Sequence, residues 1–243
     1  MNAPLRRWAK RLPAPARSLL ARAVGSRTVR RRLQPVRWGN LRRLEPVSKR
    51  WGSERGTSVD RHHIDRFFEA HAGLIRGRVL EVRDTRYSTR FGRGVDHVEI
   101  VDIDARNDDA TLIVDLAEPG SLPEGQFDCA IVPQTLMYVT DPFLAVENLW
   151  RSLAPGGALL VTVAAIARVD PDAPAVDRWH YMPAGLTELL GRVSDDVTVE
   201  GHGNPITAIA FLEGITQEEL RPHELDAEHP LFPIVVTGIA RKR

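Results

Sequence analysis

Hydrophobic residues occur along the chain in two alternating patterns, short continuous runs and helical spacing, which predict strands and helices in turn. Short apolar runs predict strands at residues 78–82, 98–103, 111–114, 127–132, 158–165, 197–201 and 234–240. Apolar residues at helical spacing predict helices at 58–73, 142–153, 186–190 and 206–212. An arginine-rich loop is expected after the first strand. This alternation favours an α/β fold with a doubly wound (Rossmann-like), mostly parallel sheet.

The first 55 residues differ from the rest in charge. They carry 16 Lys or Arg and 2 Asp or Glu, a net charge of +14, whereas residues 56–243 carry a net charge of −13. We therefore expect a basic, helical N-terminal arm at residues 1–55 and a globular domain at 56–243. The arm contains short amphipathic pieces that suit an anionic membrane surface, or that fold back onto the acidic domain. Nucleic acid is an unlikely partner, because no nucleic-acid motif accompanies the charge.

Other features narrow the class of protein. No run of 18 apolar residues is present, as a membrane-spanning helix would require, and the basic N-terminus lacks the apolar core of a secretory signal. The single cysteine, Cys129, falls within a predicted strand and cannot form an internal disulfide, so we expect a small buried hydrophobe. We expect a cytoplasmic protein, with the arm as a means of peripheral attachment at the inner face of the membrane.

Acidic residues mark the ends of the predicted strands. In a doubly wound sheet, ligands bind outside the carboxyl ends of the strands. A carboxylate about 20 positions beyond the first strand suits a ribose diol, because the two hydroxyls donate to it. Asp102 lies 19 positions after Arg83 and fits this spacing, and Glu99 and Asp104 are its alternatives.

A series of motifs resembles a known family. These are Asp115-Leu116, Leu122-Pro123, Gln126-Phe127-Asp128, Gln134-Thr135-Leu136-Met137-Tyr138, Asp141-Pro142 and Leu153-Ala154-Pro155-Gly156-Gly157. Their order and spacing resemble the class I S-adenosylmethionine-dependent methyltransferases of type 11. Four further motifs resemble a bacterial branch often encoded beside glycosyltransferases: Arg50 to Gly56 with Asp60-Arg61, Tyr87 to Gly92, Asp177 to Tyr181, and Gly201 to Asn204.

The resemblance implies a seven-stranded sheet whose last strand is antiparallel, and S-adenosylmethionine bound across strands one, two and four. It implies one role for each strand-end residue: Glu81 toward the methionine ammonium, Asp102 or Glu99 on the ribose, Asp115 and Leu116 beside the adenine, and Gln134 in the transfer crevice. These roles suit carboxylates, which accept from an ammonium and from a diol.

The loop after the first strand departs from the family pattern. The family places a glycine run directly after Glu81-Val82, and this branch commonly keeps one glycine where Arg83 stands. Either the loop, with Arg83, Asp84 and Tyr87, still contacts the cofactor and an arginine clasps its carboxylate, or cofactor binding has been lost. The first alternative predicts a methyltransferase, and the second predicts a non-catalytic scaffold or partner protein.

Two histidines are the catalytic candidates. O-methylation of a sugar hydroxyl needs a general base, and His180 follows the fifth strand in a loop placed to cover the crevice. His63 lies on the helix before strand one, where an exposed helix histidine is the alternative. No histidine or cysteine spacing typical of a metal site is evident, so we expect no metal. The expected acceptor is a small molecule or glycan, which an arginine cluster at 83, 86, 90 and 93 could grip.

Overall fold

A computed structural model describes residues 38–243; the remainder of the predicted arm lies outside the described residues. The chain divides into two units, Met1–Glu45 and Pro46–Arg243. The described part of the first holds only the 3-10 turn η1 (Gly39–Leu41). No helix among residues 38–243 is long and apolar enough to cross a membrane.

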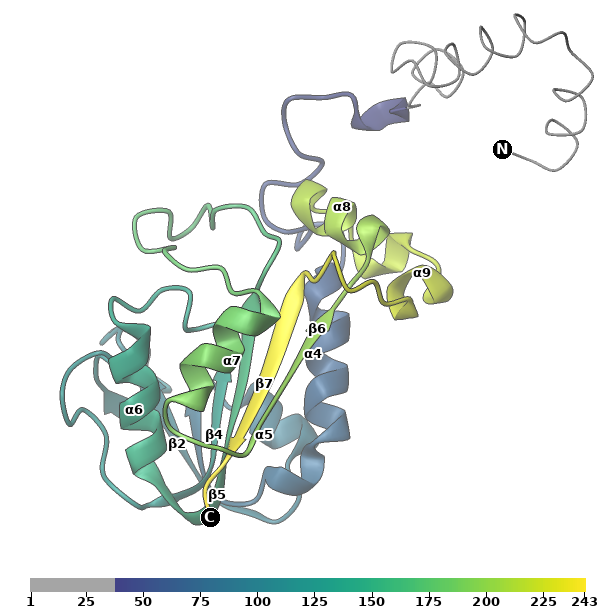
Figure 1. Ribbon diagram of the computed structural model, residues 1–243. Coiled ribbons are helices and arrows are strands. Elements are labelled where there is room, and N and C mark those ends of the chain that lie inside the picture. The colour runs from purple at the N-terminus through teal and green to yellow at the C-terminus, as the bar shows by residue number, and fades with distance from the viewer. Residues whose placement is uncertain (1–37) are drawn as a thin grey trace, which may run out of the picture. The chain divides into compact units, whose positions relative to one another are not determined.

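The second unit is built on one seven-stranded sheet with the order β3-β2-β1-β4-β5-β7-β6 (Figure 1). The strands are β1 (Gly77–Val82), β2 (Val95–Asp102), β3 (Leu112–Ile113), β4 (Phe127–Pro133), β5 (Leu153–Ala164), β6 (Val197–His202) and β7 (Val235–Arg241). Neighbouring strands from β3 to β5 pair in parallel, and β7 pairs antiparallel with both β5 and β6. The predicted fold class, with its antiparallel last strand, is confirmed.

Helices cover both faces of this sheet (Figure 1). They are α4 (Val59–Ala70), α5 (Arg86–Phe91), α6 (Pro142–Ser152), α7 (Pro183–Gly191), α8 (Pro205–Glu213) and α9 (Pro222–Asp226), with 3-10 turns η2 (Ala72–Leu74) and η3 (Gln217–Glu219). The core around α6 and α7 buries Leu149, Leu186 and Leu190, and the core around α4 and α8 buries Phe68 and Phe211. Two buried layers on one sheet hold the strand ends in fixed positions.

The prediction that the whole segment after β1 is a loop is wrong, because helix α5 forms at Arg86–Phe91 and leaves a loop of residues 83–85. Glu81 is fully buried, and its carboxylate oxygens accept from the backbone N–H groups of Tyr87 (2.8 Å) and Ser88 (2.9 Å) at the start of the helix. A carboxylate at this position satisfies amide donors that an isolated helix leaves unpaired. This contact is between β1 and α5, so local sequence patterns did not reveal it.

Residues 46–55 pack against α8. The ring of Trp51 stacks on Phe211 with centroids 4.7 Å apart, and the guanidinium of Arg168 lies 4.3 Å from the Trp51 ring centroid. The Ser48 hydroxyl accepts from the N–H of Gly52 at 2.9 Å. The motif at residues 50–56 therefore forms part of the framework of the second unit.

Candidate functional site

The loop between β1 and α5 has a glycine-like backbone at an arginine. Arg83 has φ +81°, in the left-handed region that glycine enters without steric cost, and its N–H donates to the Val101 carbonyl at 2.8 Å. A backbone conformation that glycine favours is thus adopted here by an arginine. Strained backbone of this kind is concentrated at functional sites.

A polar pocket of ≈ 330 Å³ opens beside this turn. It is lined by Arg83, Asp84, Asp102, Asp104, Arg106, Asn107 and Asp109. Four carboxylates and two guanidiniums give the pocket a net negative charge. It therefore suits a ligand that carries positive charge or hydroxyl donors.

Asn107 ties the two sides of the pocket together, and sequence reasoning missed it. Its side-chain amide donates to the Asp102 carboxylate at 2.6 Å and to the Arg83 carbonyl at 2.8 Å. Asp102 is the last residue of β2 and also accepts from the N–H of Asp104 at 3.0 Å. Asn107 lies in an irregular segment, where no periodic pattern could have indicated its contacts.

The alternative ribose ligand, Glu99, is placed elsewhere. It lies within β2, accepts from the Thr111 hydroxyl at 2.6 Å and pairs with His97 at 3.5 Å. Glu99 is not among the residues that line the pocket, whereas Asp102 is. The geometry therefore favours Asp102 over Glu99.

Other predicted cofactor contacts lie around the pocket without lining it. The Asp115 carboxylate accepts from the N–H of Ala117 at 2.8 Å, and Leu116 is buried in the core. Tyr87 is also buried, and its hydroxyl accepts from Arg61 on α4 at 2.7 Å. Glu81 is committed to the amides of α5, so none of these four side chains is shown to reach a ligand. Their cofactor roles stay predictions.

Gln134 directly follows β4 and is the second strained residue at this edge of the sheet, with φ +48°. Its backbone N–H donates to the Thr162 carbonyl at 2.7 Å, which fixes its position. The side-chain Nε2 is buried and has no hydrogen-bond partner. A buried amide donor without a partner costs free energy unless a ligand or water accepts from it.

The segment between β5 and α7 is bound to the segment after β4. The N–H groups of Arg178 and Trp179 both donate to the Met137 carbonyl, and the Arg178 guanidinium donates to the Tyr138 carbonyl at 2.7 Å. The Trp179 indole N–H donates to the Val139 carbonyl at 2.9 Å. These bonds hold the segment beside the residues that follow β4, and its predicted role as a cover for the crevice stays a prediction.

A chain of polar contacts runs from Tyr138, after β4, through two aspartates of that segment to His180. The Tyr138 hydroxyl donates to Asp170 at 2.7 Å, and the N–H of Asp170 donates to Asp177 at 2.8 Å. The other carboxylate oxygen of Asp177 lies 3.3 Å from Nε2 of His180. The Asp177 side chain is 5% exposed and that of His180 is 31% exposed, so a buried carboxylate orients an accessible imidazole.

Burial disfavours ionisation of the two tyrosines beside this segment. Burial, together with the neighbouring Asp170 carboxylate, raises the pKa of Tyr138, and the positive charge of Arg83 opposes that rise. Burial alone raises the pKa of Tyr181 to about 12. Neither phenol is a base near neutral pH.

The proposed arginine cluster does not form one surface. Arg90 donates to Asp65 on α4 at 2.5 Å, and the guanidinium of Arg86 lies 3.7 Å from Asp84. The backbone N–H of Arg93 donates to the Ile75 carbonyl, before β1. Of the four arginines at positions 83, 86, 90 and 93, only Arg83 lines the pocket.

His63 is buried rather than exposed, so the expected alternative of an exposed helix histidine is wrong. It is 4% exposed and lies beside Glu228 and His202, away from the residues that line the pocket. His202 is the last residue of β6, and its Nε2 lies 2.9 Å from the Thr237 hydroxyl. A catalytic role for His63 is untested. Cys129 is buried within β4 and, as predicted, is packed as a small hydrophobe whose thiol pKa is raised by burial.

Comparison with known proteins agrees with this geometry. Residues 88–161 match the model of a methyltransferase domain family. The chain therefore contains a region similar to a methyltransferase domain, on the fold of the class I S-adenosylmethionine-dependent methyltransferases. An S-adenosylmethionine-dependent methyltransferase from Mesorhizobium loti covers 73% of this chain, which in turn covers 96% of that protein, at 17% identity and a TM-score of 0.51.

A chain from the complex of the Haloferax volcanii Trm112 methyltransferase activator with a methyltransferase also matches this fold. Its TM-score is 0.54 at 15% identity, over 76% of this chain and 92% of that one. The ubiquinone/menaquinone biosynthesis C-methyltransferase UbiE of Enterobacter sp. is 28% identical over 111 residues, 46% of this chain. The match spans 42% of that relative's length, so the relative bears on part of the fold.

The residues at this pocket fit S-adenosylmethionine, the cofactor of the methyltransferases that share this fold. The pocket is acidic, which suits a ligand bearing a sulfonium and an ammonium, and Asp102 offers carboxylate oxygens to ribose hydroxyls. Arg83 supplies a positive charge for the ligand carboxylate, and Gln134 Nε2 is a buried donor in need of an acceptor. The arginine at the glycine position therefore leaves the turn and its charge pattern suited to the cofactor.

Proposed function

We propose that this protein transfers a methyl group to a hydroxyl of a small molecule or glycan, with His180 as the general base. The observation that carries the proposal is the contact between the accessible imidazole of His180 and the buried carboxylate of Asp177, 3.3 Å apart. A base held by a second group is the arrangement that proton abstraction from a hydroxyl requires. Bound S-adenosylmethionine supplies an electrophilic methyl group on its sulfonium.

The chain's own residues have separate tasks in this proposal. Asp102 and Arg83 bind the two polar ends of the cofactor, and Gln134 donates from the end of β4. Nε2 of His180 faces Asp177, so Nδ1 is the ring nitrogen that takes the hydroxyl proton as oxygen bonds to the methyl carbon and the carbon–sulfur bond breaks. Holding the reacting atoms in line supplies much of the acceleration for such a displacement.

Titration calorimetry tests the cofactor part first. We expect micromolar binding of S-adenosylmethionine and S-adenosylhomocysteine to the full chain. Asp102→Ala should weaken both by about 10- to 100-fold, because it removes hydrogen bonds to a charged group. Asp96→Ala, at the exposed amino-terminal end of the same strand, is the matched control and should bind normally. Absence of binding at millimolar ligand would instead favour the non-catalytic scaffold.

A methyl-label screen then tests the acceptor. Free sugars, glycosides and nucleotide sugars are incubated with methyl-labelled cofactor, and the methylated atom is located by mass spectrometry and NMR. We expect a methyl ether on a hydroxyl. A methylated carbon, as the name of the Enterobacter relative describes for that protein, would overturn the choice of oxygen as the acceptor atom.

The basic arm is proposed to hold the enzyme at an anionic membrane surface. This rests on its charge of +14 and on its amphipathic pieces, most of which lie outside the described residues. Co-sedimentation with vesicles containing phosphatidylglycerol should fall as salt rises and should disappear when residues 1–45 are deleted. Equal sedimentation of the full and shortened chains would exclude the arm as the anchor.

A further inference from the structure

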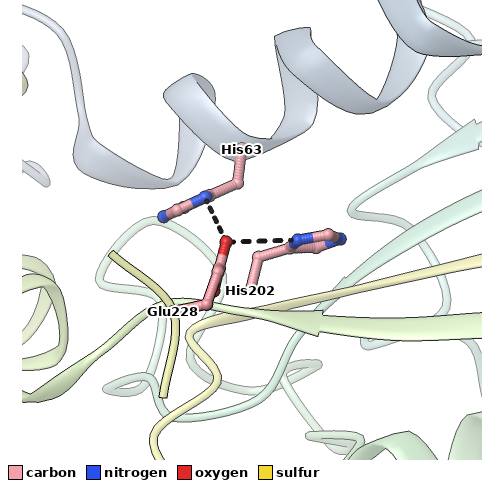
Figure 2. A group of neighbouring side chains, drawn as sticks. All are labelled: His63, His202 and Glu228. Carbon is pink, nitrogen blue, oxygen red and sulfur yellow. Dashed lines mark ion pairs between the residues drawn. The ribbon is translucent and has the colours of Figure 1, made fainter. Parts of the chain in front are cut away.

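Three potential metal ligands meet at the β6 edge of the sheet, outside the proposed active site. His63 comes from α4, His202 ends β6, and Glu228 lies between α9 and β7 (Figure 2). Oε1 of Glu228 is 3.8 Å from Nδ1 of His63 and 3.6 Å from Nδ1 of His202. The three ligand atoms all lie within 4.8 Å of one another.

Contacts outside the cluster orient two of these ligands. Nε2 of His202 lies 2.9 Å from the Thr237 hydroxyl, and in the tautomer that donates to it, Nδ1 carries a lone pair facing Glu228. Oε2 of Glu228 accepts from the N–H of Gly203 at 2.6 Å, which leaves Oε1 directed between the two imidazoles (Figure 2). Outer hydrogen bonds of this kind fix tautomer and ring orientation at metal sites.

Hydrogen bonding within the cluster does not account for the arrangement. Both nitrogen–oxygen distances to Glu228 exceed hydrogen-bond length, and Nε2 of the buried His63 has no hydrogen-bond partner. The side chain of Glu228 is 50% exposed, which leaves a path from solvent.

We propose that His63, His202 and Glu228 bind one Zn²⁺ ion, with a fourth coordination position open to solvent. Two imidazole nitrogens and a carboxylate oxygen form a donor set that zinc prefers. Bonds of about 2.0–2.2 Å in a tetrahedral site place ligand atoms roughly 3.3–3.5 Å apart. The two nitrogen–oxygen distances to Glu228 exceed that range by a few tenths of an ångström, and the half-exposed Glu228 can supply that movement. The imidazole nitrogens lie within 4.8 Å of each other, so binding of the ion also draws the two rings together.

The ion would join three segments that are distant in sequence. It links α4, which precedes the first strand, to the end of β6 and to the segment that leads into β7. A metal that binds only the folded chain raises its stability. Zinc would thus cross-link these three segments and stabilise this part of the domain. The inference does not depend on the proposed methyl transfer.

Zinc titration of the full, untagged, chelator-stripped chain tests the site. We expect one Zn²⁺ per chain by elemental mass spectrometry, a rise in Tm on zinc addition, and the visible absorption of tetrahedral Co²⁺ on cobalt substitution. Glu228→Gln keeps an acceptor for the Gly203 N–H and should lose the bound zinc and the rise in Tm. Thr237→Val should weaken binding by about 10-fold through His202.

His97→Ala is the matched control. His97 pairs with a single carboxylate, Glu99, at 3.5 Å, and the variant should bind zinc like the unmodified chain. The Tm of each zinc-free variant shows whether it is folded. A folded, unmodified chain that binds no zinc would overturn the proposal, and so would Glu228→Gln binding zinc with unchanged stoichiometry.

Discussion

Two polar centres lie at the carboxyl ends of the strands, on opposite sides of the sheet, and differ in how the chain assembles them. Because β5 and β6 are both antiparallel to β7, their carboxyl ends point the same way as those of β1 and β2. The pocket uses residues that directly follow consecutive strands, from Arg83 to Asp109. The zinc cluster draws on His63, His202 and Glu228, which are far apart in sequence. The first kind of site follows from strand order, and the second requires the packed tertiary structure.

The largest expected effect is on the rate of methyl transfer, and it distinguishes the proposed active site from the zinc cluster. His180→Ala should lower kcat by about 10²- to 10⁴-fold with whichever acceptor the label screen identifies, because it removes the general base. Asp177→Asn should reproduce most of the loss, since it keeps the shape but not the charge beside the imidazole.

Cofactor affinity and zinc-dependent Tm should be unchanged in both variants. Activity close to that of the unmodified chain in His180→Ala would remove the histidine from the mechanism. A lost response to zinc would show that the two centres are coupled.

A smaller effect is expected on the free energy of unfolding when Glu81, the buried carboxylate of β1, is replaced. Glu81→Gln should lower the free energy of unfolding by about 1–3 kcal/mol near pH 4.5, because one amide of α5 then faces an NH₂ group. Burial raises the pKa of Glu81 above 4.5, so the folded state binds a proton more tightly than the unfolded state. The unmodified chain therefore loses stability relative to the variant as pH rises above 4.5, and the difference narrows.

Urea unfolding of both proteins between pH 4.5 and 7 measures that difference. Glu69→Gln, on the exposed side of α4, is the control and should not change with pH in this way. A difference that widens with rising pH would show that the carboxylate is stabilised in its charged form.

The smallest expected effect is that of replacing Arg83 by glycine, which tests the role of this arginine in cofactor binding. Arg83→Gly should change unfolding free energy by no more than about 1 kcal/mol, because relief of left-handed strain offsets glycine's extra freedom when unfolded. It should weaken S-adenosylmethionine by about 10-fold through loss of a charged contact to the cofactor carboxylate. Calorimetry that shows tighter binding would mean that the arginine obstructs the cofactor.

The hydrophobic pattern of the chain predicts the fold and directs attention to the carboxyl ends of the strands. Apolar runs such as residues 158–165 favour buried strands, and the chain order of strands and helices leaves few topologies. The position of Asp102 could be predicted for the same reason, since it ends a strand, and that of His180 because its loop follows β5.

Which side chains meet depends on how the separate elements pack. Glu81 is buried, and its carboxylate accepts from two amides of α5, a contact that the sequence did not indicate. Asn107 joins Arg83 to Asp102, and Asp177 contacts His180, in ways that no periodic pattern records. His63 is a buried neighbour of Glu228 because α4 packs against β7. Hydrophobic periodicity specifies which face of an element is buried, whereas partners on that face are fixed only when separate elements pack together.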